Sequence, residues 1–127
     1  MTHTSEKSVD QLVGELGSDD VMVRQNARAT IVKMGSVAVE PLLSSLDSSE
    51  QHLRWEVAKS LVEIADPSAS QRLNEALADE DCDVRWVIGE AVIAIGRDAV
   101  KPLMKILKKS KPPEGLYQGA HHVIREL

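Results

Sequence analysis

Two adjacent histidines and a nearby glutamate are the side chains of this sequence best suited to hold a metal ion. His122 and Glu126 stand four residues apart, so they share one face if residues 115–127 are helical. Two or three such ligands on one terminal helix are too few to predict a metal site. We expect His121 and His122 to be solvated or to cap a helix, and we predict no bound metal.

Nucleophilic chemistry finds no better support. Cys82 is the single cysteine, and it lies between Asp81 and Asp83, whose charges disfavour a reactive thiolate. No Gly-rich loop with phosphate-binding spacing is present, so neither an enzyme nor a cofactor is predicted. A lone cysteine excludes an intramolecular disulfide framework and fits a reducing compartment. Without an apolar leader or a membrane-spanning run, a cytoplasmic location is expected.

Three arginines recur at a regular interval. Arg24, Arg54 and Arg85 are 30 and 31 residues apart. Each has an acid four residues before it: Asp20, Glu50 and Asp81. A guanidinium can hold carboxylates and unsatisfied carbonyls where helices meet, so we expect the three to form a structural ladder. A row of anion-binding sites is the alternative.

Both tryptophans directly follow an arginine of this ladder. Trp55 and Trp86 therefore occupy the same position in two repeats, on a face that avoids the apolar stripe. Large rigid aromatics among polar groups are typical of binding hot spots. Alternatively, the rings cover the groove between repeats and complete the core. The predicted partner-binding residues are Trp55, Glu56, Lys59, Glu63, Trp86, Val87 and Glu90.

The elements that must position these residues are helices. Segments 23–35, 53–65 and 84–96 align without gaps. Apolar residues recur 3, 7 and 10 positions after each arginine: Ala27, Ile31, Met34, Val57, Leu61, Ile64, Ile88, Val92 and Ile95. These offsets mark one face of an α-helix. With two Trp, one Tyr and no Phe, the interior must be built from aliphatic side chains.

A second helix accompanies each of these, which predicts four helix pairs. After a flexible N-terminus (1–7), the approximate repeats are 8–34, 37–64, 68–95 and 99–127. Ser36 and Ser68 are expected to cap helices. Tyr117 stands at the arginine position of the last pair. One pair cannot bury its apolar face, so an all-α solenoid is predicted. The clean count after Met1 favours a complete small protein.

Two segments carry a family resemblance. VRWVIGEAVIAIG (84–96) and AVKPLMKIL (99–107) resemble the short HEAT-like repeats of the phycobilisome lyase type, with an armadillo-like helical fold. The resemblance implies that the helices beginning Val-Arg line a concave surface. Members include scaffolds, cofactor-attachment chaperones and an iron enzyme, deoxyhypusine hydroxylase. Its His-Glu pairs would fall at Gln25-Asn26, Trp55-Glu56, Trp86-Val87 and Gln118-Gly119, so its metal site is not carried over.

Charge is distributed unevenly along the chain. The formal net charge is −5, which argues against nucleic-acid binding. Lys101, Lys105 and Lys108 nevertheless share one face of the last outer helix. This basic patch could dock an acidic partner or a nucleic-acid backbone, although a solvated face is the simpler interpretation.

The sequence thus favours a non-enzymatic scaffold or adaptor that binds a protein or peptide on the concave face. The alternative is an accessory or relative of a cofactor-handling enzyme, similar to a bilin lyase or an oxidoreductase. A third hypothesis is self-association through the exposed solenoid ends.

Overall fold

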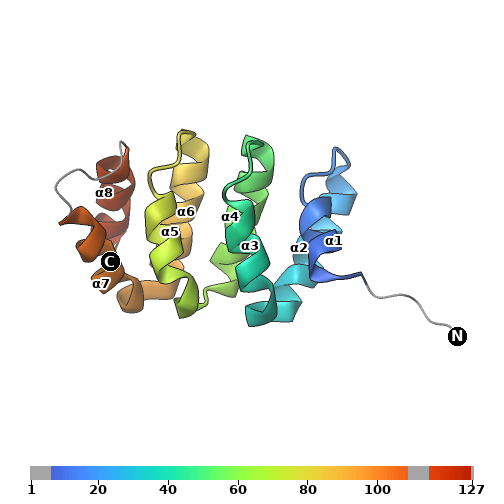
Figure 1. The fold of residues 1–127 in the computed structure, drawn as a ribbon, viewed down its shortest axis with the longest axis horizontal. Helices are drawn as coiled ribbons and strands as arrows, with labels where there is room; N and C mark the ends of the chain where they lie inside the picture. Colours follow the sequence, from blue (N-terminus) through green and yellow to red (C-terminus); the bar gives the residue numbers. More distant parts are fainter. Residues whose placement is uncertain (1–6, 109–114, 127) are drawn as a thin grey trace, which may run out of the picture.

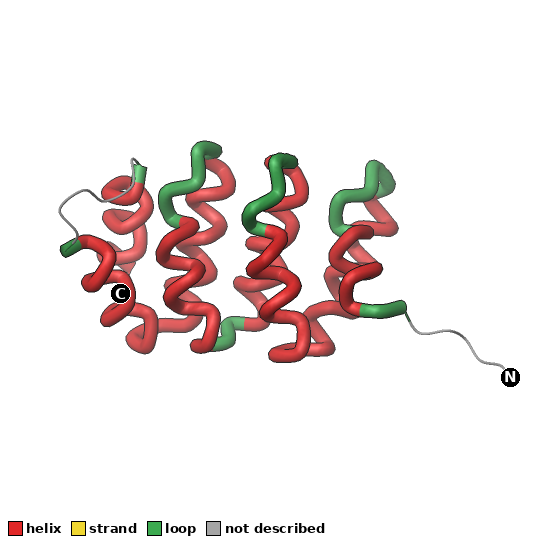
Figure 2. Tube along the Cα trace, viewed as in Figure 1, coloured by secondary structure: helices red, strands yellow, loops and turns green. Residues whose placement is uncertain are grey.

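A computed structural model describes residues 7–108 and 115–126. Nearly all of the segment expected to be flexible (1–7) lies outside this range. The described residues form helices standing in a row, without strands (Figures 1 and 2). The α-helices are α1 (Val9–Glu15), α2 (Val21–Met34), α3 (Val39–Ser45), α4 (Gln51–Ile64), α5 (Ser70–Ala76), α6 (Cys82–Ile95), α7 (Val100–Leu107) and α8 (Leu116–Glu126). The predicted solenoid of four helix pairs is confirmed.

The helices form two layers. α2, α4, α6 and α8 pack side by side in one layer, while α1 contacts α3 and α5 contacts α7 in the other. The chain ends lie at opposite ends of the row (Figure 1). Each repeat therefore touches only its neighbours, as in other solenoids. None of the described helices has the length and apolar character needed to cross a bilayer.

Aliphatic side chains fill the space between the layers. At the first two stripe positions, 3 and 7 residues after each arginine, all side chains are buried: Ala27, Ile31, Val57, Leu61, Ile88 and Val92. The third position is only partly buried, because it lies at the helix end. α8 departs from the pattern, since it packs through Leu116, Ala120 and Val123 and leaves Ile124 54% exposed.

Most outer helices begin with a short 3-10 turn. These turns span Gly35–Ala38, Pro67–Ala69 and Gly96–Ala99. The prediction that Ser36 and Ser68 cap helices is wrong, because both lie within these turns. Asp66 makes the cap instead, its Oδ1 accepting a hydrogen bond from the Ser68 amide at 2.9 Å.

Two of the three acids that precede the ladder arginines cap their helices, α2 and α6. Asp20 Oδ1 accepts from the Met22 amide at 2.8 Å, and Asp81 Oδ1 accepts from the Asp83 amide at 2.9 Å. Glu50 makes no side-chain cap. A carboxylate at this position satisfies amides that have no helical partner. Neither Asp20 nor Asp81 forms an ion pair with the arginine that follows it.

Each ladder arginine instead ties the loop in front of its own helix. The Nη1 atoms of Arg24, Arg54 and Arg85 donate to the carbonyl oxygen six residues earlier, at 2.6, 3.0 and 2.7 Å. Arg54 also holds the Asp79 carboxylate at two points, with Nε–Oδ2 at 2.8 Å and Nη2–Oδ1 at 3.1 Å. This bond to Asp79 raises the pKa of the Arg54 guanidinium above its ordinary value. Because this pKa is raised, the guanidinium is fully charged at neutral pH, and its contribution to stability is lost as the pH rises into strong alkali.

Three helices, α2, α4 and α6, end at residues with positive φ. Gly35 (φ 65°) and Gly96 (φ 85°) adopt backbone conformations that only glycine takes readily. The middle repeat has Ala65 there, at φ 49° and ψ 44°. A left-handed alanine costs about 1–2 kcal/mol through the contact of its Cβ with the backbone.

Replacing Ala65 with glycine should therefore stabilise the protein. The substitution Ala65→Gly relieves the left-handed alanine but adds chain entropy to the unfolded state. We expect the free energy of unfolding to rise by about 0.5–1 kcal/mol, measured by urea denaturation. Gly96→Ala, the matched reverse change, should lower it by about 1–3 kcal/mol. A destabilised Ala65→Gly variant would contradict this account.

Removing the Arg54 guanidinium should be costly. Only 6% of the Arg54 side chain and 10% of the Asp79 side chain are exposed, so Arg54→Met leaves a desolvated carboxylate without its partner. We expect the free energy of unfolding to fall by about 3 kcal/mol. Arg72→Met is the control, because its partner Asp47 is 77% exposed and its loss should cost below about 1 kcal/mol. Equal losses in the two variants would disprove a special role for Arg54.

Candidate protein-binding site

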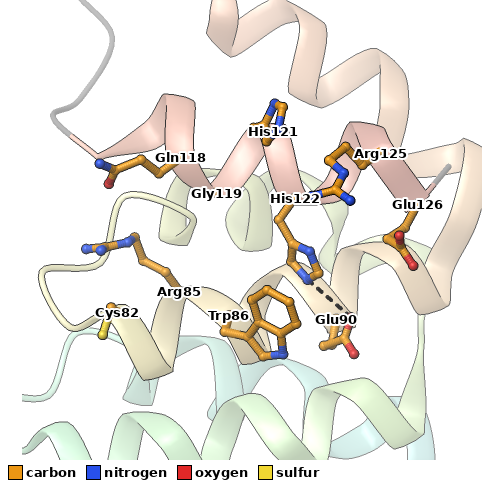
Figure 3. Close-up of a pocket in the computed structure, with 10 residues that line it drawn as sticks. All are labelled: Cys82, Arg85, Trp86, Glu90, Gln118, Gly119, His121, His122, Arg125 and Glu126. Atoms are coloured by element: carbon orange, nitrogen blue, oxygen red, sulfur yellow. Dashed lines mark ion pairs between the residues drawn. The ribbon is translucent and has the colours of Figure 1, made fainter.

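A cleft of about 400 Å³ opens between α6 and α8. Figure 3 shows its lining, with α6 contributing one wall and α8 the other. We call it the α6–α8 cleft. It is lined by Cys82, Arg85, Trp86, Glu90, Gln118, Gly119, His121, His122, Arg125 and Glu126. Two of these, Trp86 and Glu90, belong to the predicted partner-binding set.

Trp86 is held in place from α8. Its ring stacks on His122 with centroids 3.8 Å apart and planes inclined by 17°, while 58% of the residue stays exposed (Figure 3). Stacking fixes the indole in one orientation and leaves its other side open. The cleft thus presents a rigid aromatic surface. Because the ring is already ordered in the folded protein, a ligand loses little affinity to immobilising it.

His122 lies against a glycine and a glutamate of α6. Its Nε2 is 3.3 Å from Glu90 Oε2, an ion-pair distance, but the direction does not suit a hydrogen bond. The ring lies directly over Gly89, where a Cβ atom would come within 2.6 Å of His122 Cδ2. The absence of a side chain at Gly89 therefore makes room for the imidazole.

A second glycine brings α8 close to the preceding repeat. A Cβ atom at Gly119 would come within 2.7 Å of the carbonyl oxygen of Leu77. Glycine inside a helix usually costs about 0.5–1 kcal/mol, which close packing can offset. Gly89 and Gly119 were not singled out from the sequence, although glycine at the middle of a helix is a signal of close approach.

The structure separates the two tryptophans by environment. Trp55 is half-buried against the core, with Lys59 Nζ 4.0 Å from its ring centroid, a cation–π contact. It does not line the α6–α8 cleft. Val87 is also half-buried against the core. Of the predicted aromatic pair, only Trp86 offers a largely exposed ring.

Glu56 lies differently from its expected exposed position. It is only 4% exposed, because its carboxylate joins two arginines of α2. Arg24 Nε is 3.4 Å from Oε2, and Arg28 Nη1 is 3.0 Å from Oε1. Glu63 remains exposed and lies 3.7 Å from Arg28 Nε. These ion pairs join α4 to α2. Arg28, which takes part in two of them, was not predicted from the sequence.

The remaining candidate residues lie elsewhere. Lys101, Lys105 and Lys108 are all exposed on or just after α7, in the other layer. Met104, also on α7, is 43% exposed. Within residues 7–108 and 115–126, no group of three or more His, Cys, Asp or Glu side chains could hold a metal ion.

Substitution by alanine should lower the stability of the protein at Gly119 but not at Gly89. Gly119→Ala pushes a Cβ atom against backbone, so the free energy of unfolding should fall by about 1–3 kcal/mol. Gly89→Ala meets only the His122 side chain, which can swing away. This variant should keep its stability within about 0.5 kcal/mol but lose the Trp86–His122 stack. Urea denaturation and the emission of Trp86 in a Trp55→Phe background test both. An unchanged emission in Gly89→Ala would contradict the assigned contact.

Comparison with known proteins agrees with this architecture. A family model of HEAT repeats matches residues 9–93, more than half of the chain. This span covers α1 to α5 and most of α6. No curated protein matches the chain. The phycobilisome lyase subtype stays a prediction, but the chain belongs to the family of HEAT repeats.

Proposed function

We propose that this protein is a non-enzymatic adaptor of the cytoplasm that binds a segment of another protein in the α6–α8 cleft. HEAT repeats generally mediate protein–protein interaction and are typically not catalytic. The observation that carries the proposal for this chain is Trp86, 58% exposed and held flat against His122 at the cleft wall.

The surroundings of Trp86 suit recognition of a peptide. An aromatic ring bordered by polar and charged groups is the composition of interface hot spots. Glu90, Gln118 and Arg125 supply hydrogen-bonding groups of both charges around the ring. A cleft of about 400 Å³ accommodates a few side chains, in the size range of known ligand sites.

The exposed face of α7 serves as the comparison surface. Lys101 and Lys105 could attract an acidic partner, and Met104 is the exposed apolar residue between them. The layer of α7 is separate from the α6–α8 cleft, and the overall charge of −5 opposes general attraction of polyanions. Truncating Met104 therefore provides a matched control for truncating Trp86.

Affinity capture from the native cell extract tests the proposal. Wild-type protein should retain a partner that Trp86→Ala loses, with an affinity decrease of at least about tenfold, because hot-spot truncation costs about 2 kcal/mol or more. Met104→Ala should retain it. Circular dichroism and thermal melting must first show that both variants fold as the wild type does.

Other results would redirect the assignment. Retention by Trp86→Ala and loss on replacing Lys101 and Lys105 with glutamine would move the interface to α7. A partner identified as a second copy of this chain, with a doubled mass in solution, would make self-association the function.

A further inference from the structure

The third arginine of the ladder, unlike the first two, pairs with no carboxylate in the part of the chain that the structure describes. Arg24 lies 3.4 Å from Glu56 and Arg54 lies 2.8 Å from Asp79. Arg85 makes one hydrogen bond, from Nη1 to the Asp79 carbonyl oxygen at 2.7 Å. Among residues 7–108 and 115–126, no carboxylate oxygen lies within ion-pair distance of its guanidinium.

The packing of α8 explains this difference. Glu56, which pairs with Arg24, lies on α4, two residues after the ladder arginine Arg54. The corresponding residue after Tyr117 is Gly119. Because a Cβ atom there would come within 2.7 Å of the Leu77 carbonyl, a glutamate does not fit. The close approach of α8 thus excludes an acid from the α8 position that corresponds to Glu56.

The nearest acid of the preceding loop is already engaged. Both carboxylate oxygens of Asp79 bind Arg54, and Oδ1 also accepts from the Asp81 amide at 2.9 Å. Asp79 therefore offers Arg85 only its backbone carbonyl. The other N–H groups of the Arg85 guanidinium can donate to a ligand, and their planar arrangement matches the two oxygens of a carboxylate.

Arg85 and Trp86 face the same cleft. Figure 3 shows Arg85 with Gln118 at one end, the Trp86–His122 stack in the middle, and Glu90 with Glu126 towards the other end. The Arg85 end has no acid in its lining and favours a carboxylate, whereas at the other end Glu90 and Glu126 outnumber the one cation, Arg125. An apolar side chain next to that carboxylate would reach the open side of Trp86.

We propose that the α6–α8 cleft recognises an extended segment of a partner protein in which an Asp or Glu side chain stands beside a large apolar side chain. The carboxylate binds the Arg85 guanidinium, and the apolar group packs on Trp86. This inference rests on the proposed function and adds the chemistry of the bound segment.

Selection from a random peptide library displayed on phage identifies such segments directly. Wild-type protein should enrich peptides with an acid close to a large aliphatic or aromatic residue. One enriched peptide and its Glu→Gln counterpart, both with amidated C-termini, are then titrated against the Trp55→Phe protein by Trp86 fluorescence. The acidic peptide should bind about 10- to 100-fold more tightly, as expected for a charge-assisted hydrogen bond.

A double-mutant cycle assigns this preference to Arg85. In Arg85→Gln the difference between the two peptides should disappear, and in Arg85→Lys it should be reduced. Arg97→Gln, which changes an exposed arginine outside the cleft, should keep it. Trp86→Ala, with binding followed by calorimetry, should weaken both peptides by a similar factor. Thermal melting checks the fold, because Arg85→Gln also loses the bond to Asp79.

The outcomes separate this inference from the proposed function. Enriched peptides that require Trp86 but show no acidic preference would overturn the inference and leave the adaptor function standing. An acidic preference that survives in Arg85→Gln would overturn it as well. Failure to enrich any peptide that depends on Trp86 would overturn both.

Discussion

The bond between a ladder arginine and the carbonyl six residues earlier is the contact that organises this solenoid. Every hairpin of helices must turn its chain, and the turn exposes backbone carbonyls that helices cannot satisfy. In three repeats the same guanidinium atom, Nη1, meets that need at 2.6–3.0 Å. With the loop held, the two helices of a pair keep their aliphatic faces together, and successive pairs bury a continuous core.

Local periodicity was sufficient to predict the layers and the pairing of helices. The first two stripe positions of α2, α4 and α6 are buried because each repeat packs against a similar neighbour. The same reasoning failed at α8, where Ile124 fits the stripe but lies exposed. Among the described helices of its layer, α8 contacts only α6, so its packing differs from that of α4 and α6, which have a neighbour on each side. Gly119 allows this contact to be close.

The candidate site was only partly predictable, because its features arise between repeats. Equal sequence positions placed Trp55 and Trp86 together on one face. Their environments differ, since Lys59 covers the first ring whereas His122 of the next helix supports the second. Glu56 matched an open position by its offset, but two arginines of α2 hold it nearly buried. The contact of Lys59 with Trp55 lies within one helix, but those of His122 and Glu56 join residues about one repeat apart, and the apolar periodicity of a single helix does not predict them.

The ladder also separates folding from recognition in the evolution of such a protein. Each ladder arginine stabilises the loop before its own helix by donating to a backbone carbonyl, and this acceptor is present whatever the neighbouring side chains are. The carboxylate that pairs with the guanidinium differs between repeats: it comes from the next helix at Arg24 and from the loop before the next helix of that layer at Arg54. At Arg85, which pairs with no carboxylate among residues 7–108 and 115–126, the facing side chains can change without breaking a buried ion pair. A chain built this way can acquire new specificity through few mutations.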